Sequence, residues 1–183
     1  SSGRLQSVSN PEGILTYTYS AVGSQIASFT YQARFNSYNH GLYTYDYYPN
    51  GATKSIEHQY YQTTNTSTYS YDLNGQVTQR SVGPAETIYK YDHQGRVINI
   101  LHKMDGIFHS EYRYGYDDNH YLGLRTSMTV INQQESLTHV YDYDPQYRLS
   151  SVRYPTSDYN PYLYIRETHE FSYDAIGNRT EWV

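Results

Sequence analysis

The sequence predicts an all-β fold, an antiparallel meander of repeated β-hairpins. Three observations predict it: a tyrosine motif recurs along the chain, turn residues follow the motif, and no window keeps a helical apolar period. Strong copies of the motif occupy residues 69–76, 89–96 and 171–179. Looser copies occupy residues 17–23, 43–51, 114–117 and 141–144, so that successive copies are 20 to 30 residues apart. A spacing of this size indicates a repeat protein whose function lies in an assembled surface.

The first half of each motif reads Tyr-x-Tyr and is expected to be a strand. Side chains alternate along an extended chain, so both rings point to one face, and tyrosine favours such a half-buried, pleated surface. The strand half of the motif contains Tyr17, Tyr19, Tyr43, Tyr45, Tyr69, Tyr71, Tyr89, Tyr91, Tyr114, Tyr116, Tyr141, Tyr143, Phe171 and Tyr173.

The second half of each motif is expected to be a tight turn. In Asp72-Leu73-Asn74-Gly75 the aspartate can accept hydrogen bonds from turn amides, and the glycine allows a positive φ. Valine at Gly75 or Gly95 should therefore cost about 1–2 kcal/mol. The turn half of the motif contains Gly23, Asp46, Gly51, Asp72, Gly75, Asp92, Gly95, Arg96, Asp117, Asp144, Asp174, Gly177 and Arg179.

Two copies lack the glycine, those that end at Asp117 and Asp144, and their turns are expected to differ in geometry. In the first copy of the motif, Ser20 is expected to replace the aspartate in a turn that ends at Gly23. A second strand should follow each turn, as in residues 76–82, 96–102 and 178–183, which gives about fourteen strands in all. Residues 1–183 are expected to form one array of about seven repeats, cut from a longer chain that begins and ends in mid-pattern.

Composition favours a folded chain and excludes several functions. Leu, Ile, Val and Phe number only 33 of 183 residues, but 26 tyrosines supply aromatic area and the net charge is −5. The absence of cysteine excludes disulfides and thiolate metal sites. With 13 scattered Lys and Arg residues the chain is a poor candidate for binding nucleic acid, and no apolar run is long enough for a spanning helix.

The aspartates and histidines each allow a second interpretation. The repeat aspartates could bind calcium, but one carboxylate per turn is a small ligand set, so capping of their own turns is the preferred interpretation. The eight histidines never occur at metal-ligand spacing, and no nucleophile, phosphate-loop or zincin motif is present. We therefore expect no catalytic residues, no metal site and no cofactor.

The motif Tyr-x-Tyr-Asp-x-x-Gly-Arg, with Gly-Arg-Leu ahead of Pro-x-Gly between Gly3 and Gly13, resembles the YD repeats of the RHS family. This family includes bacterial RHS proteins, the C component of Tc toxins and the extracellular part of teneurins. The resemblance implies a section of a spiralling β-sheet shell, or an open β-solenoid-like sheet, in a secreted or cell-surface protein of bacterial type. The self-cleavage module of the RHS family has no counterpart in this sequence.

The function implied is a non-catalytic scaffold, a wall segment of a shell that encloses a toxin or builds a surface protein. Its partners would be flanking repeats of the same polypeptide or other shell parts, with an enclosed toxin or a glycan as further candidates, and without nucleic acid or membrane insertion. The alternative is an adhesion module that binds carbohydrate or protein through exposed tyrosines. Candidate ligand-binding residues for that alternative are Tyr159, Tyr162 and Tyr164, in a Pro-containing interruption of the pattern.

Overall fold

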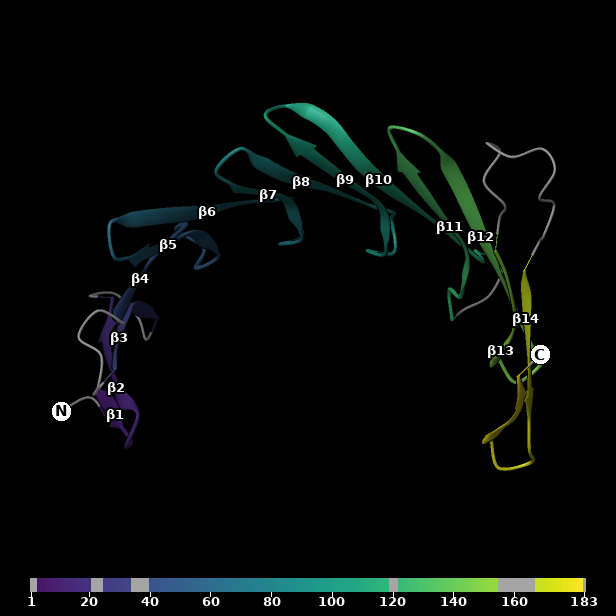
Figure 1. Ribbon diagram of the computed structural model, residues 1–183, viewed down its shortest axis with the longest axis horizontal. Coiled ribbons are helices and arrows are strands. Elements are labelled where there is room, and N and C mark those ends of the chain that lie inside the picture. The colour runs from purple at the N-terminus through teal and green to yellow at the C-terminus, as the bar shows by residue number, and fades with distance from the viewer. Residues whose placement is uncertain (1–2, 21–24, 34–39, 119–121, 155–166, 183) are drawn as a thin grey trace. The chain divides into compact units, whose positions relative to one another are not determined.

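The computed structural model describes residues 3–20, 25–33, 40–118, 122–154 and 167–182 of the chain. These residues form fifteen strands and no helix (Figure 1). The strands are β1 Ser7–Ser9, β2 Gly13–Tyr19, β3 Ile26–Ala33, β4 His40–Tyr47, β5 Thr53–Tyr60, β6 Thr63–Tyr71, β7 Val77–Val82, β8 Ala85–Tyr91, β9 Val97–Met104, β10 Ile107–Tyr116, β11 Arg125–Asn132, β12 Ser136–Tyr143, β13 Leu149–Arg153, β14 Thr168–Tyr173 and β15 Arg179–Trp182. Strand order follows the sequence, as in a meander. The prediction of an all-β antiparallel meander is confirmed.

The chain divides into two compact units, residues Ser1–Glu86 and Thr87–Val183. The first contains β1 to β7, the second β9 to β15, and β8 spans the boundary. Every strand pair whose register is defined within a unit is antiparallel. Among the described residues, no helix is both long and apolar enough to cross a membrane.

A β-bulge interrupts the strand pairing just before the last tyrosine of each of six strands. Short turns that end in a residue with positive φ are accompanied by such a bulge, so the bulges before Tyr47, Tyr71, Tyr143 and Tyr173 follow from the turns after them. The register shifts lie at Thr18/Tyr19, Asp46/Tyr47, Ser70/Tyr71, Gly115/Tyr116, Asp142/Tyr143 and Ser172/Tyr173.

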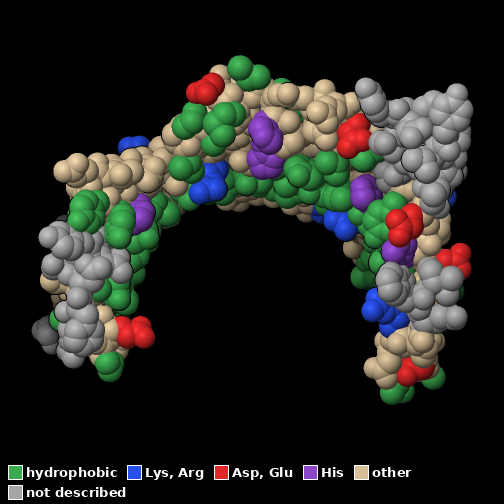
Figure 2. All heavy atoms as spheres, in the orientation of Figure 1, with side chains coloured by type: hydrophobic (Ala, Val, Ile, Leu, Met, Phe, Trp, Pro, Cys, Tyr) green, Lys and Arg blue, Asp and Glu red, His purple; other side chains and the backbone are tan. Residues whose placement is uncertain are grey.

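Tyrosine rings gather on one face of the sheet, as the alternation of side chains predicts. In the first unit Tyr17, Phe29, Tyr43 and His58 lie directly opposite one another on β2, β3, β4 and β5. Their successive ring centroids are 6.2, 4.4 and 4.2 Å apart, and the last two pairs are stacked. Cross-strand aromatic pairs of this kind each contribute roughly 0.2–1 kcal/mol. Figure 2 shows hydrophobic side chains along this face in each unit.

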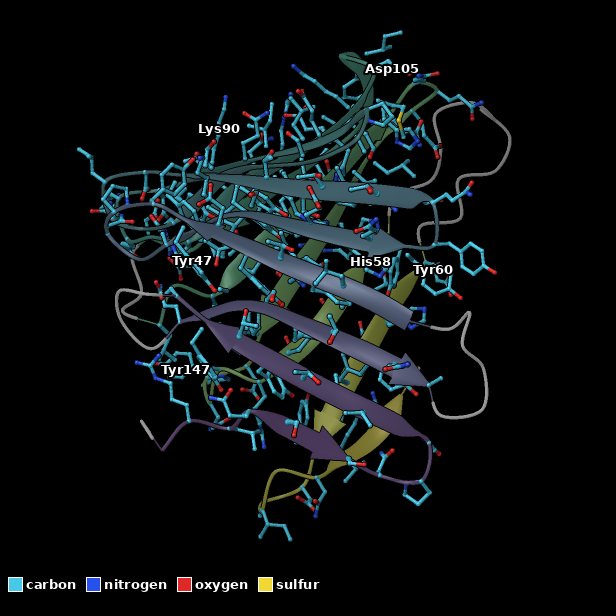
Figure 3. The ribbon with its side chains drawn as sticks, turned by 90° about the vertical axis from the view of Figure 1, so that its left-hand side faces the viewer. Tyr47, His58, Tyr60, Lys90, Asp105 and Tyr147 are labelled. Carbon is cyan, nitrogen blue, oxygen red and sulfur yellow. The ribbon has the colours of Figure 1, made fainter. Side chains whose placement is uncertain are left out.

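The opposite face carries small polar side chains. Thr18 and Ser28 hydroxyls are 2.7 Å apart in the first unit, and those of Thr129 and Thr138 are 2.8 Å apart in the second. The strands β4 and β5 place Tyr47 and Tyr60 at opposite ends of their hairpin (Figure 3). Each hairpin therefore has a turn end, where the motif lies, and a far end.

Burial is slight throughout the described residues. Val152, with 5% of its surface exposed, is the only apolar side chain in them that is buried. Within each unit the described strands contact only their neighbours in the meander, so no second layer covers the tyrosine face there. Stability must therefore come from strand pairing and from contacts between successive repeats.

Candidate functional site

The best-formed feature of the chain is the turn that follows the motif tyrosines, and Asp92 shows how it is built. Asp92 Oδ1 accepts hydrogen bonds from the backbone N–H groups of Gln94 and Arg96, both at 2.9 Å. Asp92 and Arg96 are also joined by a backbone bond of 3.0 Å, and Gly95 N donates to Asp92 O at 3.0 Å. The carboxylate thus holds the backbone of its own turn.

The same arrangement recurs in three other turns. Asp72, Asp144 and Asp174 each accept two backbone N–H bonds on Oδ1, from the second and fourth residues after the aspartate, at 2.8–3.0 Å. The expectation that repeat aspartates cap their own turns is confirmed for these four residues. Gly75 and Gly95 have φ values of +81° and +82°, which also agrees with the turn prediction.

The second carboxylate oxygen holds the side chain that leaves the turn. Asp92 Oδ2 lies 2.6 Å from Arg96 Nε, and Asp144 Oδ2 lies 2.7 Å from Arg148 Nε. At the last turn Asn178 replaces the arginine and its Nδ2 is 3.0 Å from Asp174 Oδ2. Beyond the turn, Arg96 Nη2 pairs with the carboxylate of Asp118, and Arg148 Nη1 donates to Asp174 O at 3.4 Å.

Each of these arginines reaches the next repeat. Arg96 Cζ lies 4.4 Å from the ring centroid of Tyr116, and Arg148 Cζ lies 4.5 Å from that of Tyr173. These are cation–π contacts. We call the two triads Asp92–Arg96–Tyr116 and Asp144–Arg148–Tyr173 the Asp–Arg–Tyr locks. At the start of the chain Arg4 lies over Tyr19 at 5.3 Å in the same manner.

The tyrosine hydroxyl completes each lock by reaching back to the preceding repeat. Tyr116 Oη donates to Val97 O and Tyr173 Oη donates to Leu149 O, both at 2.8 Å. Each acceptor directly follows the lock arginine. Corresponding bonds join Tyr19 to Leu5 O, Tyr47 to Ile26 O and Tyr143 to Arg125 O, at 2.7–2.8 Å. Consecutive hairpins are thus tied together through side chains as well as through strand pairing.

The carboxyl groups of Asp92, Asp144 and Asp174 have a lowered pKa. Partial burial, which by itself raises the pKa of Asp92, is outweighed by hydrogen bonds from the Arg96 backbone, the Arg96 side chain and Gln94 N. The pKa of Asp144 is lowered by the same balance with Arg148 and Gln146. For Asp174 the hydrogen bond from the Asn178 side chain is the main cause of a lowered pKa. All three carboxylates are therefore held in the charged form.

We expect Tyr116→Phe to lower the free energy of unfolding by about 1 kcal/mol, because it removes a partly buried hydroxyl that donates to Val97 O. Tyr141→Phe is the matched control, since the described residues give its hydroxyl no hydrogen bond. Urea unfolding followed by circular dichroism would measure both. Equal midpoints for the two variants would contradict the hydroxyl's role in the lock.

The second repeat differs from its sequence assignment. The turn there begins at Tyr48, whose N–H donates to Ala52 O at 2.9 Å, while Gly51 N donates to Tyr48 O at 2.9 Å. Asp46 instead lies on β4 opposite Ser55, and its carboxylate pairs with Lys54 at 2.8 Å. The assignment of Asp46 as a turn residue was wrong, because Pro49, Asn50 and Gly51 set the turn two residues later.

Two of the looser turns also depart from expectation. Asp144 was expected to form a different turn without glycine, yet Tyr147 takes the glycine position with a φ of +64° and donates its N–H to Asp144 O at 2.8 Å. Ser20 N bonds Gln25 O, five residues on, so this turn is longer than the expected one. Gly23 lies outside the described residues.

The turn that starts at Asp117 does differ, as expected. Asp117 N bonds Leu124 O at 2.8 Å, seven residues later, whereas Asp92 bonds the fourth residue after it. Arg125 follows Leu124 and its guanidinium lies 4.6 Å from the Tyr141 ring. Arg179 lies 5.6 Å from the Phe171 ring. Tyr159, Tyr162 and Tyr164, the candidate ligand-binding tyrosines, lie outside the described residues.

Sequence reasoning missed Arg148 and Arg4 as members of this contact system. Their signal is positional, because Arg148 stands four residues after Asp144 just as Arg96 stands four after Asp92. Because residues 144–147 contain no glycine, the sequence did not reveal that the Asp144 turn matches the Asp92 turn.

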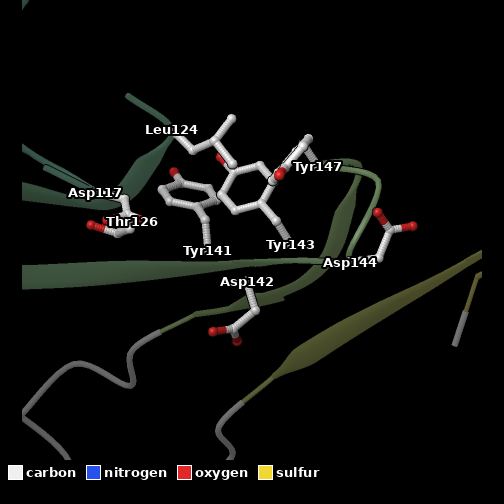
Figure 4. A pocket seen from close by; sticks show the side chains of 8 residues that line it. All are labelled: Asp117, Leu124, Thr126, Tyr141, Asp142, Tyr143, Asp144 and Tyr147. Carbon is white, nitrogen blue, oxygen red and sulfur yellow. The ribbon is translucent and has the colours of Figure 1, made fainter. Parts of the chain in front are cut away.

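Open clefts lie beside these turns. One of about 280 Å³ is lined by Tyr141, Tyr143, Tyr147 and Asp117 among others, with Asp142 pointing to the other side of its strand (Figure 4). The Asp142 carboxylate is 2.8 Å from Ser151 Oγ. Within the described part of the chain, no group of three or more His, Asp and Glu side chains could hold a metal ion.

Comparison with solved structures gives the fold a precedent. A chain in the structure of the Photorhabdus luminescens Tc holotoxin pore matches 94% of this chain with a TM-score of 0.63 and 17% identity. A chain in the TcdB2–TccC3 crystal structure matches 88% with a TM-score of 0.53 and 15% identity. The fold is that of part of a Tc toxin.

This likeness confirms the fold and supports the resemblance to RHS shells that the motifs indicate. The chain spans only 11% and 10% of the two matching chains. No protein-family model and no curated protein matches the sequence.

Proposed function

We propose that the chain is a non-catalytic wall segment of an RHS-type shell, in a secreted bacterial protein. The main observation behind this proposal is the pair of Asp–Arg–Tyr locks, which join one hairpin to the next. In the described part of the sheet only one apolar side chain is buried, so these contacts matter for its stability. These contacts use the chemistry of the motif to build an extended surface. A wall needs that property, whereas a small-molecule site needs an enclosed pocket.

The tyrosine face supports the assignment of partners. Its rings are half-buried and no second layer covers them in the described strands of either unit. A face of this kind is stabilised by further repeats, by other shell parts or by an enclosed polypeptide. The Tc toxin neighbours, which are multi-part assemblies by their printed names, favour the first two. No observation on the described residues favours the carbohydrate-binding alternative.

Light scattering behind size exclusion, with circular dichroism on the eluted peak, tests the proposal. We expect the isolated chain to be β-rich and to elute as oligomers or aggregates well above 21.4 kDa. Unpaired strand edges and solvent-facing tyrosine rings tend to associate with other copies of the chain. A β-rich, cooperatively unfolding monomer would instead indicate a self-standing module. Electron microscopy of a longer natural chain that contains this segment should show a hollow shell.

A further inference from the structure

The junction between the Tyr48 turn and Tyr71 is one of those that lack the arginine of the Asp–Arg–Tyr locks. Ala52 O accepts the backbone bond from Tyr48 N, as Arg96 O does from Asp92 N, so Ala52 occupies the position of Arg96. Tyr71 corresponds to Tyr116, since each is the last motif tyrosine of its strand and follows a bulge. No arginine of the described chain lies over the Tyr71 ring.

A cleft takes the place of the missing guanidinium. It has a volume of about 440 Å³ and is lined by Tyr48, Pro49, Asn50, Ser70, Tyr71 and Asp72. The Tyr48 ring stands edge-on to the Tyr71 ring at 6.1 Å and 89°, and the Tyr48 hydroxyl is held by Tyr69 O at 3.0 Å. Pro49 and Asn50 are exposed, so the cleft opens to solvent. Two aromatic rings are thereby fixed around a space that a side chain can enter.

The carboxylate at the edge of this cleft has an unused oxygen. Asp72 Oδ1 accepts the N–H groups of Asn74 and Gln76 at 2.9 Å, but no described residue donates a hydrogen bond to Asp72 Oδ2. In the turns of Asp92 and Asp144 that oxygen binds an arginine Nε. None of the cleft residues carries a positive charge, and the whole chain has a net charge of −5.

We propose that the cleft of Tyr48, Tyr71 and Asp72 binds the guanidinium of an arginine side chain presented by a separate polypeptide. The planar cation stacks on the Tyr71 ring and donates to Asp72 Oδ2, the two kinds of contact that Arg96 makes elsewhere in the chain. The opposite charge of the chain favours a basic partner segment. This inference rests on local geometry and goes beyond the wall function, so either can fail alone.

Solid-state nuclear magnetic resonance of the isotope-labelled full chain, which does not require a monomer, tests the site while an acetylated Gly-Arg-Gly amide is titrated in as the probe. We expect chemical-shift changes at Asn50, Tyr71 and Asp72. The arginine peptide should bind about threefold or more tighter than its lysine counterpart, and the citrulline counterpart should not bind. Asp72→Asn keeps the Oδ1 acceptor that caps the turn and should weaken binding about threefold. Equal binding of the arginine and lysine peptides, or shift changes elsewhere only, would overturn the proposal.

Ala52→Arg provides the second test, because it supplies the missing guanidinium within the chain. We expect this variant to abolish binding of the arginine peptide and to raise the unfolding midpoint, while Ala52→Ser leaves both unchanged. Undiminished peptide binding to a folded Ala52→Arg chain would overturn the site. If that variant does not fold, the Asp72→Asn comparison decides alone.

Discussion

Replacing Gly13 with alanine should lower the free energy of unfolding by about 2–3 kcal/mol, because the added Cβ overpacks the start of β2. It would lie 2.6 Å from Gln32 O and 2.8 Å from Cε2 of Tyr31. Gln32 is paired with Ile14 in the β2–β3 ladder, so its carbonyl cannot move without loss of strand pairing. Urea unfolding followed by far-ultraviolet circular dichroism would measure the loss.

Gly75→Val separates this steric effect from backbone strain. A Cβ at Gly75 meets nothing within 4 Å, but its φ of +81° disfavours any L side chain. We expect a cost of about 1–2 kcal/mol there, less than at Gly13 despite the larger side chain. An unchanged midpoint for Gly13→Ala would mean that β2 and β3 are paired more loosely at this end than the structure shows.

The fold could be predicted because its information is local. Tyr-x-Tyr fixes a face, and Asp-x-x-Gly fixes a turn whose bonds involve only five residues, as at Asp92. The error at Asp46 shows the limit. Because tyrosines occupy positions 43, 45, 47 and 48, the repeat motif can be aligned with this segment in more than one way. Only the position of Gly51 identifies Tyr48 as the start of the turn.

The contacts between repeats could not be predicted in the same way. Arg96 and Tyr116 are 20 residues apart, and which ring a guanidinium meets depends on strand register and on the bulge before Tyr116. Tyr147 marks a second limit, since no rule of turn chemistry places a tyrosine at a φ of +64°. The surrounding hydrogen bonds of Asp144 impose that conformation.

The chain should lose stability as the pH falls below about 5, and the turn aspartates should account for much of the loss. Asp92, Asp144 and Asp174 have a lower pKa in the folded chain than an ordinary carboxyl group. An unfolded chain restores their pKa to about 3.9, so it binds more protons than the folded chain across the interval between the two values. The stabilisation is therefore complete above the unfolded pKa and is lost as the pH falls through the folded one.

A triple variant, Asp92→Asn, Asp144→Asn and Asp174→Asn, tests the source of this acid sensitivity. Asparagine keeps one acceptor for the turn amides but removes the charge that binds Arg96 and Arg148. We expect a lower midpoint at neutral pH and a flatter acid limb, with proton uptake on unfolding reduced by about one to two protons. Asp46 and Glu111 also have a lowered pKa, so some acid sensitivity should remain.

The matched control changes the net charge equally without touching a turn carboxylate. Asp105→Asn, Glu57→Gln and Glu170→Gln alter exposed acids to whose carboxylates no described residue donates a hydrogen bond. Their triple variant should keep the acid limb of the parent chain, because it removes three negative charges but none of the hydrogen bonds that hold the turns. If both triple variants flatten the acid limb alike, general charge repulsion drives acid unfolding, and the Asp–Arg–Tyr locks are not its cause.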